Sequence, residues 1–214
     1  MPRLRARNIS MSVDGFMAGP DQSLDAPLGA RGQELHRWAF ATRTFGPMFG
    51  RGDSGTTGLD DDMAKRGDEG IGANILGRNM FGPVRGPWGD SDWRGWWGDE
   101  PPYHTPVFVL THHAHDPIEM LGGTTFHFVT DGIEAAYERA MAAAGGLDVR
   151  VGGGAATIRS YMRAGLLDEL HVVIVPILLG GGERVFDRPT PGYECVEHVA
   201  SDTVTHVRFE RRAG

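Results

Sequence analysis

The sequence predicts an α/β fold: a mixed, mainly parallel sheet flanked by helices and followed by a C-terminal antiparallel hairpin. Runs rich in β-branched and aromatic residues, such as 106–111 and 124–130, alternate with helical runs such as 131–146. The last two strand-like runs, 193–201 and 203–210, have no helix between them. Neither an internal repeat nor a linker divides the 214 residues, so we expect a single domain over 1–214.

The N-terminal half begins with a strand over 7–15, "RNISMSVDG", in which apolar and polar residues alternate up to a turn at Asp14-Gly15. A helix is expected within 32–40. Residues 46–72 are rich in glycine and charge and predict a long surface loop, which we interpret as an insertion. The run 73–82 predicts a strand, a glycine turn and the start of a helix. A tryptophan-rich loop is expected over 83–106.

The C-terminal half repeats a strand-and-helix order. Strands are expected at 106–111 and 124–130, and a helix over 131–146 stops at two glycines. A strand at 148–151 then leads through three glycines into a helix that ends at Gly165. A further strand, 170–179, precedes the second glycine triplet at 180–182 and the final hairpin.

Composition restricts the function. A formal net charge of −7 argues against binding to nucleic acid or to an anionic membrane. No apolar run approaches the ~20 residues of a membrane span, and "MPRLRARNIS" (1–10) lacks the apolar core of a signal peptide, so we expect a cytoplasmic protein. The single cysteine, Cys195, excludes an internal disulfide and a cysteine-rich zinc site. The only lysine, Lys65, lies among glycines and aspartates, which argues against Schiff-base chemistry.

The glycines at two strand-to-helix junctions indicate a bound anion. A helix beginning near Ala155 presents unpaired backbone N–H groups, and glycines 152–154 would let a phosphate reach them. At the other junction Gly77 ends a strand, and Arg78 offers a forked cation. A tight turn explains either junction alone. Two together favour a dinucleotide, although the spacing is neither that of a Rossmann fold nor that of a P-loop.

Four segments carry a family resemblance: "ISMSVDGFMAG" (9–19), "ANILGRNMF" (73–81), "PVFVLT" (106–111) and "VGGGAATIRSYMRAGLLDELHVVIVPILLGGGERVF" (151–186). They resemble the reductase half of bifunctional riboflavin-biosynthesis proteins and their dihydrofolate-reductase-like relatives. The resemblance covers nearly the whole chain apart from 46–72 and the tryptophan-rich segment. It implies a dihydrofolate-reductase fold, NADPH as the hydride donor, and a homodimer.

The resemblance also implies where NADPH binds. The pyrophosphate would lie at the start of the helix after the glycine triplet, with further phosphate contacts at the other junction, the adenosine ribose and its 2′-phosphate at the end of 106–111, and the nicotinamide beside the first turn. The residues that would hold the pyrophosphate are Gly152, Gly153, Gly154, Ala155, Ala156 and Thr157, and those for the further phosphate contacts are Gly77, Arg78 and Asn79. Thr111 and His112 would lie by the ribose and its 2′-phosphate, and Ser10, Met17 and Ala18 would lie by the nicotinamide.

The chain departs from its relatives in three places. Riboflavin-pathway reductases commonly carry a substrate-contacting glutamate where this sequence has Val151. The zinc-deaminase half, with its H-x-E and C-x-x-C motifs, is absent. Dihydrofolate reductases bind the pterin through a carboxylate on the first helix, where Glu34 is the only one here. The substrate is therefore left open among pyrimidine, pterin and flavin-like compounds.

Several single residues have two interpretations. Asp14 could help to deliver a proton or could simply shape the turn with Gly15. His36 and Trp38 could face a substrate, or Trp38 could pack into the core. The tryptophans of the 83–106 loop could line a pocket or a dimer interface. The histidines at 112, 113 and 115 lack the i,i+4 spacing of a helical metal site, so no metal is expected.

These observations favour an NADPH-dependent oxidoreductase that transfers a hydride to a small heterocyclic or carbonyl substrate, similar to 5-amino-6-(5-phosphoribosylamino)uracil reductase. The alternative is a non-catalytic nucleotide- or flavin-binding protein on the same fold, which the valine at 151 favours. A purely structural dimer module would not explain glycines at two junctions. The expected partners are a small molecule and a second copy of the chain.

Overall fold

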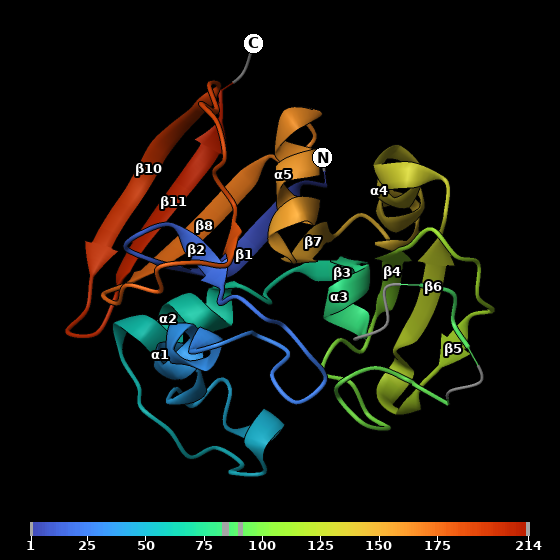
Figure 1. Ribbon diagram of the computed structural model, residues 1–214, viewed down its shortest axis with the longest axis horizontal. Helices are drawn as coiled ribbons and strands as arrows, with labels where there is room; N and C mark the ends of the chain where they lie inside the picture. Colours follow the sequence, from blue (N-terminus) through green and yellow to red (C-terminus); the bar gives the residue numbers. More distant parts are fainter. Residues whose placement is uncertain (1, 83–85, 90–91, 213–214) are drawn as a thin grey trace. The chain divides into compact units, whose positions relative to one another are not determined.

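The computed structural model describes residues 2–82, 86–89 and 92–212 and divides into two compact units. The first unit contains residues 1–5 and 70–167, and the second contains 6–69 and 168–214. Strand β1 (Leu4–Ser12) gives its first two residues to the first unit and the remainder to the second. Figure 1 shows the elements of each unit along the chain.

The first unit is a mostly parallel sheet. Its strands follow β1 in the order β7, β3, β4, β6, β5, and all neighbouring pairs are parallel except β5 and β6. Both faces of a parallel strand are usually covered, and the last five residues of β3 are accordingly all buried. The bounds are β7 (Asp148–Gly153), β3 (Ile71–Gly77), β4 (Pro106–Leu110), β6 (Thr125–Val129) and β5 (Ile118–Glu119).

Helices of the first unit pack on this sheet through small or apolar side chains. In α4 (Gly132–Ala143), Ala136 and Ala140 are fully buried, and the helix contacts β3 and β4. In α5 (Ala155–Arg163), the buried Tyr161 donates its hydroxyl hydrogen bond to the Ile133 carbonyl at 2.9 Å. The short helices are α3 (Arg78–Phe81) and the 3-10 helix η3 (Leu121–Gly123).

The second unit is mainly antiparallel. Its strand order is β10, β11, β8, β1, and β11 pairs in antiparallel fashion with both β10 and β8 (Figure 1). The bounds are β8 (Glu169–Val175), β10 (Tyr193–Ala200) and β11 (Thr205–Arg211), with a separate two-stranded sheet of β2 (Phe16–Ala18) and β9 (Glu183–Arg184). The helices are η1 (Gly32–His36), α1 (Arg37–Phe40), η2 (Pro47–Phe49) and α2 (Leu59–Arg66).

The predicted fold class is confirmed: a mixed, mainly parallel sheet flanked by helices, and a C-terminal antiparallel hairpin made by β10 and β11. The prediction of an unbroken loop over 46–72 is wrong, since that range contains η2 and α2. Three aspartates in the first turn of α2 and two basic residues in its last turn complement the helix dipole. In the tryptophan-rich loop, the described residues between 82 and 105 form neither helix nor strand.

The alternation predicted for the first strand fails at one residue. Asn8 has a φ of 58°, in the left-handed region, which shifts the phase of the side chains that follow. As a result Ser10 and Ser12 are buried, and Val13 is 60% exposed. None of the helices among the described residues combines the length and the apolar character needed to cross a membrane.

Candidate functional site

Three parallel strands of the first unit end side by side. In the sheet register, Leu76 on β3 lies opposite Gly153 on β7, and Gly77 lies opposite Leu110 on β4. The residues that follow these positions therefore emerge at one edge of the sheet. This edge brings together the predicted phosphate-binding residues at 152–157, at 77–79 and at 111–112.

The two glycine junctions touch. A Cβ atom built on Gly77 would collide with the Thr157 hydroxyl oxygen and would lie 3.4 Å from the Gly153 carbonyl oxygen and 3.5 Å from the Gly154 nitrogen. Glycine at 77 therefore lets β3 approach the start of α5. The juxtaposition proposed from the sequence is present in the structure.

Each glycine of the triplet has a different reason to be there. Gly152 packs closely against Leu76: a Cβ there would lie 2.6 Å from Leu76 Cδ2, so the buried Leu76 side chain would have to move. Gly153 has a φ of +127°, which L-residues rarely adopt, and its peptide bond to Gly154 is cis. Gly154 has an ordinary φ of −77°, and a Cβ there would meet nothing within 4 Å. Packing explains the glycine at 152 and backbone conformation explains the one at 153. Neither requires glycine at 154, where a side chain would have open space.

That open space lies at the start of α5, where Gly154 is the N-cap. The Gly154 carbonyl accepts the hydrogen bond of Ile158 N–H at 3.1 Å, the first bond of the helix. Helix geometry leaves the N–H groups of 155–157 without intrahelical partners, and the helix dipole adds about half a positive elementary charge there. Ala156 is exposed at this end. The arrangement suits an anionic group that approaches over Gly154.

Arg78 and Asn79 follow Gly77 on α3. The Arg78 guanidinium lies over the ring of Trp88, and burial lowers the pKa of Arg78 to about 10. Asn79 is exposed, and its carbonyl accepts the Trp96 indole N–H at 3.4 Å. Both residues stay predicted phosphate contacts, since a guanidinium that lies over a ring still directs its N–H groups outward in its own plane.

Thr111 and His112 follow β4 directly. Thr111 is buried; its hydroxyl accepts the His113 N–H at 3.1 Å and donates to the His113 carbonyl at 3.3 Å. These bonds fold the chain back at the strand end and leave His112 exposed. Among the described residues, no group of three histidine, cysteine or acidic side chains lies close enough to hold a metal.

The predicted nicotinamide residues belong to the second unit. Ser10 is buried, and its hydroxyl oxygen accepts the Trp38 indole N–H at 2.9 Å. Met17 is half-buried, and Ala18 is buried and pairs with Glu183 across the small sheet. Their contact with a cofactor stays a prediction.

Asp14 joins the first turn to the second glycine triplet. Its carboxylate oxygens accept the Leu179 N–H at 3.1 Å and the Gly180 N–H at 2.7 Å. Hydrogen bonds from the Ser12 hydroxyl and from these two N–H groups lower the pKa of Asp14 to about 2. A carboxylate so strongly stabilised is a poor proton donor at neutral pH, so the geometry favours the turn interpretation of Asp14 over the catalytic one.

The first helix places Trp38 in the core. Trp38 is 5% exposed, packs with Val173 and Val204, and meets the His206 ring edge-on at 5.2 Å. His36 stacks on Phe40, and burial lowers the pKa of His36 to about 4. A substrate contact for either residue stays a prediction.

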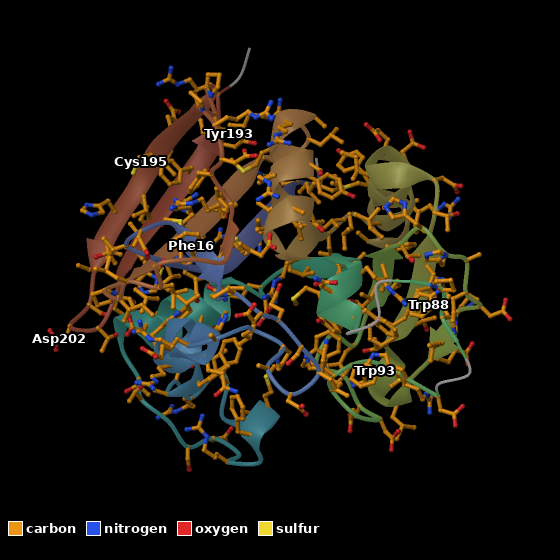
Figure 2. All side chains as sticks on the ribbon, viewed as in Figure 1. Phe16, Trp88, Trp93, Tyr193, Cys195 and Asp202 are labelled. Atoms are coloured by element: carbon orange, nitrogen blue, oxygen red, sulfur yellow. The ribbon has the colours of Figure 1, made fainter. Side chains whose placement is uncertain are left out.

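The tryptophans of the 83–106 loop cover the core of their own unit. Trp88 and Trp93 donate their indole N–H groups to the carbonyls of His113 and Phe81, at 2.8 and 2.9 Å. Figure 2 labels both tryptophans. With Trp97 they pack against a cluster that contains Phe81 and Phe126. All three are half-buried by their own chain, which reduces the apolar area that they offer to a second copy.

Comparisons with known proteins concern the fold and the family. A crystal structure from Shewanella sp. PV-4, named "putative riboflavin biosynthesis protein", aligns with 20% sequence identity and a TM-score of 0.60. The alignment covers 100% of both chains. A dihydrofolate reductase from Enterococcus faecalis, complexed with NADP(H) and RAB-propyl, aligns with 12% sequence identity and a TM-score of 0.52. The alignment covers 99% of this chain and 97% of the other. A search of the curated proteins found no match.

A third solved structure is a Thermotoga maritima diaminohydroxyphosphoribosylaminopyrimidine deaminase/5-amino-6-(5-phosphoribosylamino)uracil reductase, at 16% identity and a TM-score of 0.57. The alignment covers 99% of this chain but 57% of that one. At such identities the three likenesses concern the fold. The sequence itself matches the family model of the RibD C-terminal domain over residues 6–207. The chain therefore belongs to the RibD C-terminal domain family.

Proposed function

We propose that the protein is an NADPH-dependent reductase that transfers a hydride to a small heterocyclic or carbonyl substrate, of pyrimidine, pterin or flavin-like type. The observation that carries the proposal is the open position at Gly154, beside the start of α5 and next to the second glycine junction. Family membership and a fold shared with an NADP(H)-bound dihydrofolate reductase support it.

The residues at the strand ends fit a dinucleotide. The N–H groups of 155–157 would bind one phosphate of the pyrophosphate, and Gly154 would let it approach. Arg78 and Asn79 would contact phosphate from the neighbouring strand end. The exposed His112 would lie by the 2′-phosphate that distinguishes NADPH from NADH. NADPH would supply the hydride, and the protein would hold and orient the cofactor.

The substrate stays open because no carboxylate occupies the family's contact position. Val151 is fully buried in β7, and Glu34 is held by two hydrogen bonds from Arg31, at 2.9 and 3.1 Å. These two observations also favour the second candidate, a nucleotide- or flavin-binding protein without catalysis. Following nicotinamide absorbance with a panel of pterins, flavins and pyrimidines separates the two candidates, because the second predicts no oxidation of NADPH with any of them.

The cofactor site is tested with two glycine-to-alanine variants. Gly154→Ala adds a methyl group into open space at an ordinary φ, so it should leave stability unchanged. It should weaken NADPH binding more than tenfold, because displacing a phosphate loses charge-assisted hydrogen bonds of about 1.5–3 kcal/mol each. Gly181→Ala is the matched control, since its nearest neighbour would be Pro20 Cγ at 3.9 Å. Equal NADPH affinity in both variants, measured by calorimetry, would contradict the proposed site.

A further inference from the structure

The second unit contains a cavity that shares no residue with the proposed cofactor site, although Trp38, a predicted substrate contact, lies in its wall. Its volume is about 650 Å³, within the range of about 300–1,000 Å³ that is typical of sites for small organic ligands. Its walls come from η1 and α1, from the start of α2, from the end of β8, and from the turn between β10 and β11. Figure 2 labels Asp202 at the tip of that turn. The cavity shares no residue with the sheet edge at 77, 111 and 152–157.

A carboxylate in the wall is held in one orientation. Asp60, on the first turn of α2, accepts a hydrogen bond from His206 Nε2 at 2.9 Å on one oxygen and from the Thr203 hydroxyl at 2.7 Å on the other. Burial alone would raise the pKa of Asp60, but these hydrogen bonds outweigh burial and lower it. Asp60 is therefore an oriented anion, and its side chain keeps 18% of its surface exposed.

The histidine behind Asp60 belongs to a buried chain of hydrogen bonds. Asn8 N–H donates to Nδ1 of His171 at 3.3 Å, and Nε2 of His171 lies 3.1 Å from Nδ1 of His206. A backbone N–H can only donate, so His171 carries its proton on Nε2 and donates it to His206. His206 then carries its own proton on Nε2 and donates it to Asp60.

This direction of the chain decides the charge next to the cavity. Both imidazole rings use one nitrogen as an acceptor, so both are neutral, and burial lowers the pKa of His171 to about 3. The hydrogen-bond chain thus orients Asp60 without supplying a positive charge. The lining contains the acidic residues Glu34, Asp60 and Asp202 and one arginine, Arg37. Glu34 is already paired with Arg31, so Asp60 and Asp202 outnumber the remaining basic charge. The lining is therefore net acidic.

We propose that this cavity binds a small organic cation, an ammonium or amidinium group on an apolar body. The cationic group would donate to Asp60, whose carboxylate retains lone pairs beyond the hydrogen bonds it accepts from the protein. The apolar body would lie against the side chains of Leu59, Val175 and Ile177, which also line the cavity. Such a site combines an apolar wall with one oriented polar group, as small-molecule sites usually do.

The test is a titration with tryptamine, a cation on a flat apolar body, and with indole-3-propionate, which carries an anion on the same body. Calorimetry should show saturable binding of tryptamine and no binding of indole-3-propionate. Asp60→Asn should reduce the affinity for tryptamine at least tenfold. Its amide can still accept from His206 and donate to the Thr203 oxygen, so the fold should persist. Asp62→Asn, an exposed position on the same helix outside the cavity wall, is the charge-matched control and should bind as the wild type does.

A second variant keeps the proposal testable even if Asp60→Asn misfolds. Ala41→Phe would narrow the cavity without removing a polar group, and it should also abolish tryptamine binding. In the wild type, the Nε2–H resonance of His206 should shift during the titration, since it donates to Asp60. Equal affinity for the two indoles, or wild-type affinity in a folded Asp60→Asn or Ala41→Phe variant, would overturn the proposal.

Discussion

Gly77, the last residue of β3, meets Thr157 in the first turn of α5, and a Cβ on Gly77 would collide with the Thr157 hydroxyl oxygen. Gly77→Ala should therefore destabilise the protein by about 1–3 kcal/mol, the usual cost of overpacking. Because Thr157→Ala removes the colliding oxygen, the double variant should be about as stable as Thr157→Ala alone. Chemical denaturation of the four proteins measures this coupling, and additive losses would contradict the contact.

Asp14 should stabilise the native state in a way that depends on pH. Its pKa falls from an ordinary value of 3.8 to about 2 on folding, so the stabilisation is complete above pH 4 and is lost as the pH falls towards 2. Asp14→Asn should lower the denaturation midpoint at pH 7, and the difference from wild type should shrink between pH 4 and 2. If the difference between the two midpoints stays constant over this range, the negative charge of Asp14 is not the source of the stabilisation.

The buried histidines should keep one tautomer each. We expect long-range ¹H–¹⁵N spectra at pH 7 to show His171 and His206 both neutral and protonated on Nε2. Because folding lowers the pKa of His171 from 6.5 to about 3, only the unfolded chain takes up this proton as the pH falls below 6.5. Wild type should accordingly lose its stability advantage over His171→Gln between pH 6.5 and 4. A Nδ1-protonated His171 would reverse the hydrogen-bond chain and contradict the orientation given for Asp60.

The homodimer expected from the family resemblance has a candidate surface in β10. This strand ends the sheet order and exposes Val196 and Cys195 (Figure 2 labels Cys195), and an edge strand offers unpaired backbone groups to a second chain. Light scattering should give twice the chain mass of 23.2 kDa. Val196→Lys should lower the mass towards that of one chain, whereas Val13→Lys, at another exposed valine, should not. A wild-type mass of one chain would refute the dimer.

The sequence predicted the elements whose pattern is local. The strand at 106–111, the helix at 131–146 and the closing hairpin follow from β-branched content, helical periodicity and glycine stops, and all three are present. The glycine junctions at 77 and 152–154 were also predictable, because glycine after a strand usually marks a close approach or a positive φ. The helix α2 was missed because its only two buried residues, Met63 and Ala64, stand between three aspartates and two basic residues.

Interactions between distant segments could not be predicted in the same way. The hydrogen-bond chain draws Asp60, His171 and His206 from three separate parts of the sequence, and none of them stands in a recognisable motif. The role of Asp14 also depends on Leu179 and Gly180, which follow it by 165 and 166 positions in the sequence. The left-handed backbone at Asn8 reversed the expected faces of the first strand. Asparagine adopts this conformation only occasionally, so its presence in a strand pattern does not predict it.

The division of β1 between two units has a consequence for the order in which the chain can fold. The Arg3 N–H bonds to Asp148, 145 positions along the chain, and Leu4 pairs with Val149. Asn8, in the other part of the strand, bonds to His171, 163 positions away. During synthesis, therefore, β1 emerges before β7 and β8 and cannot form its pairs until they have been made. Contacts of such separation slow folding, and chaperone binding to this early strand would protect it in the interval.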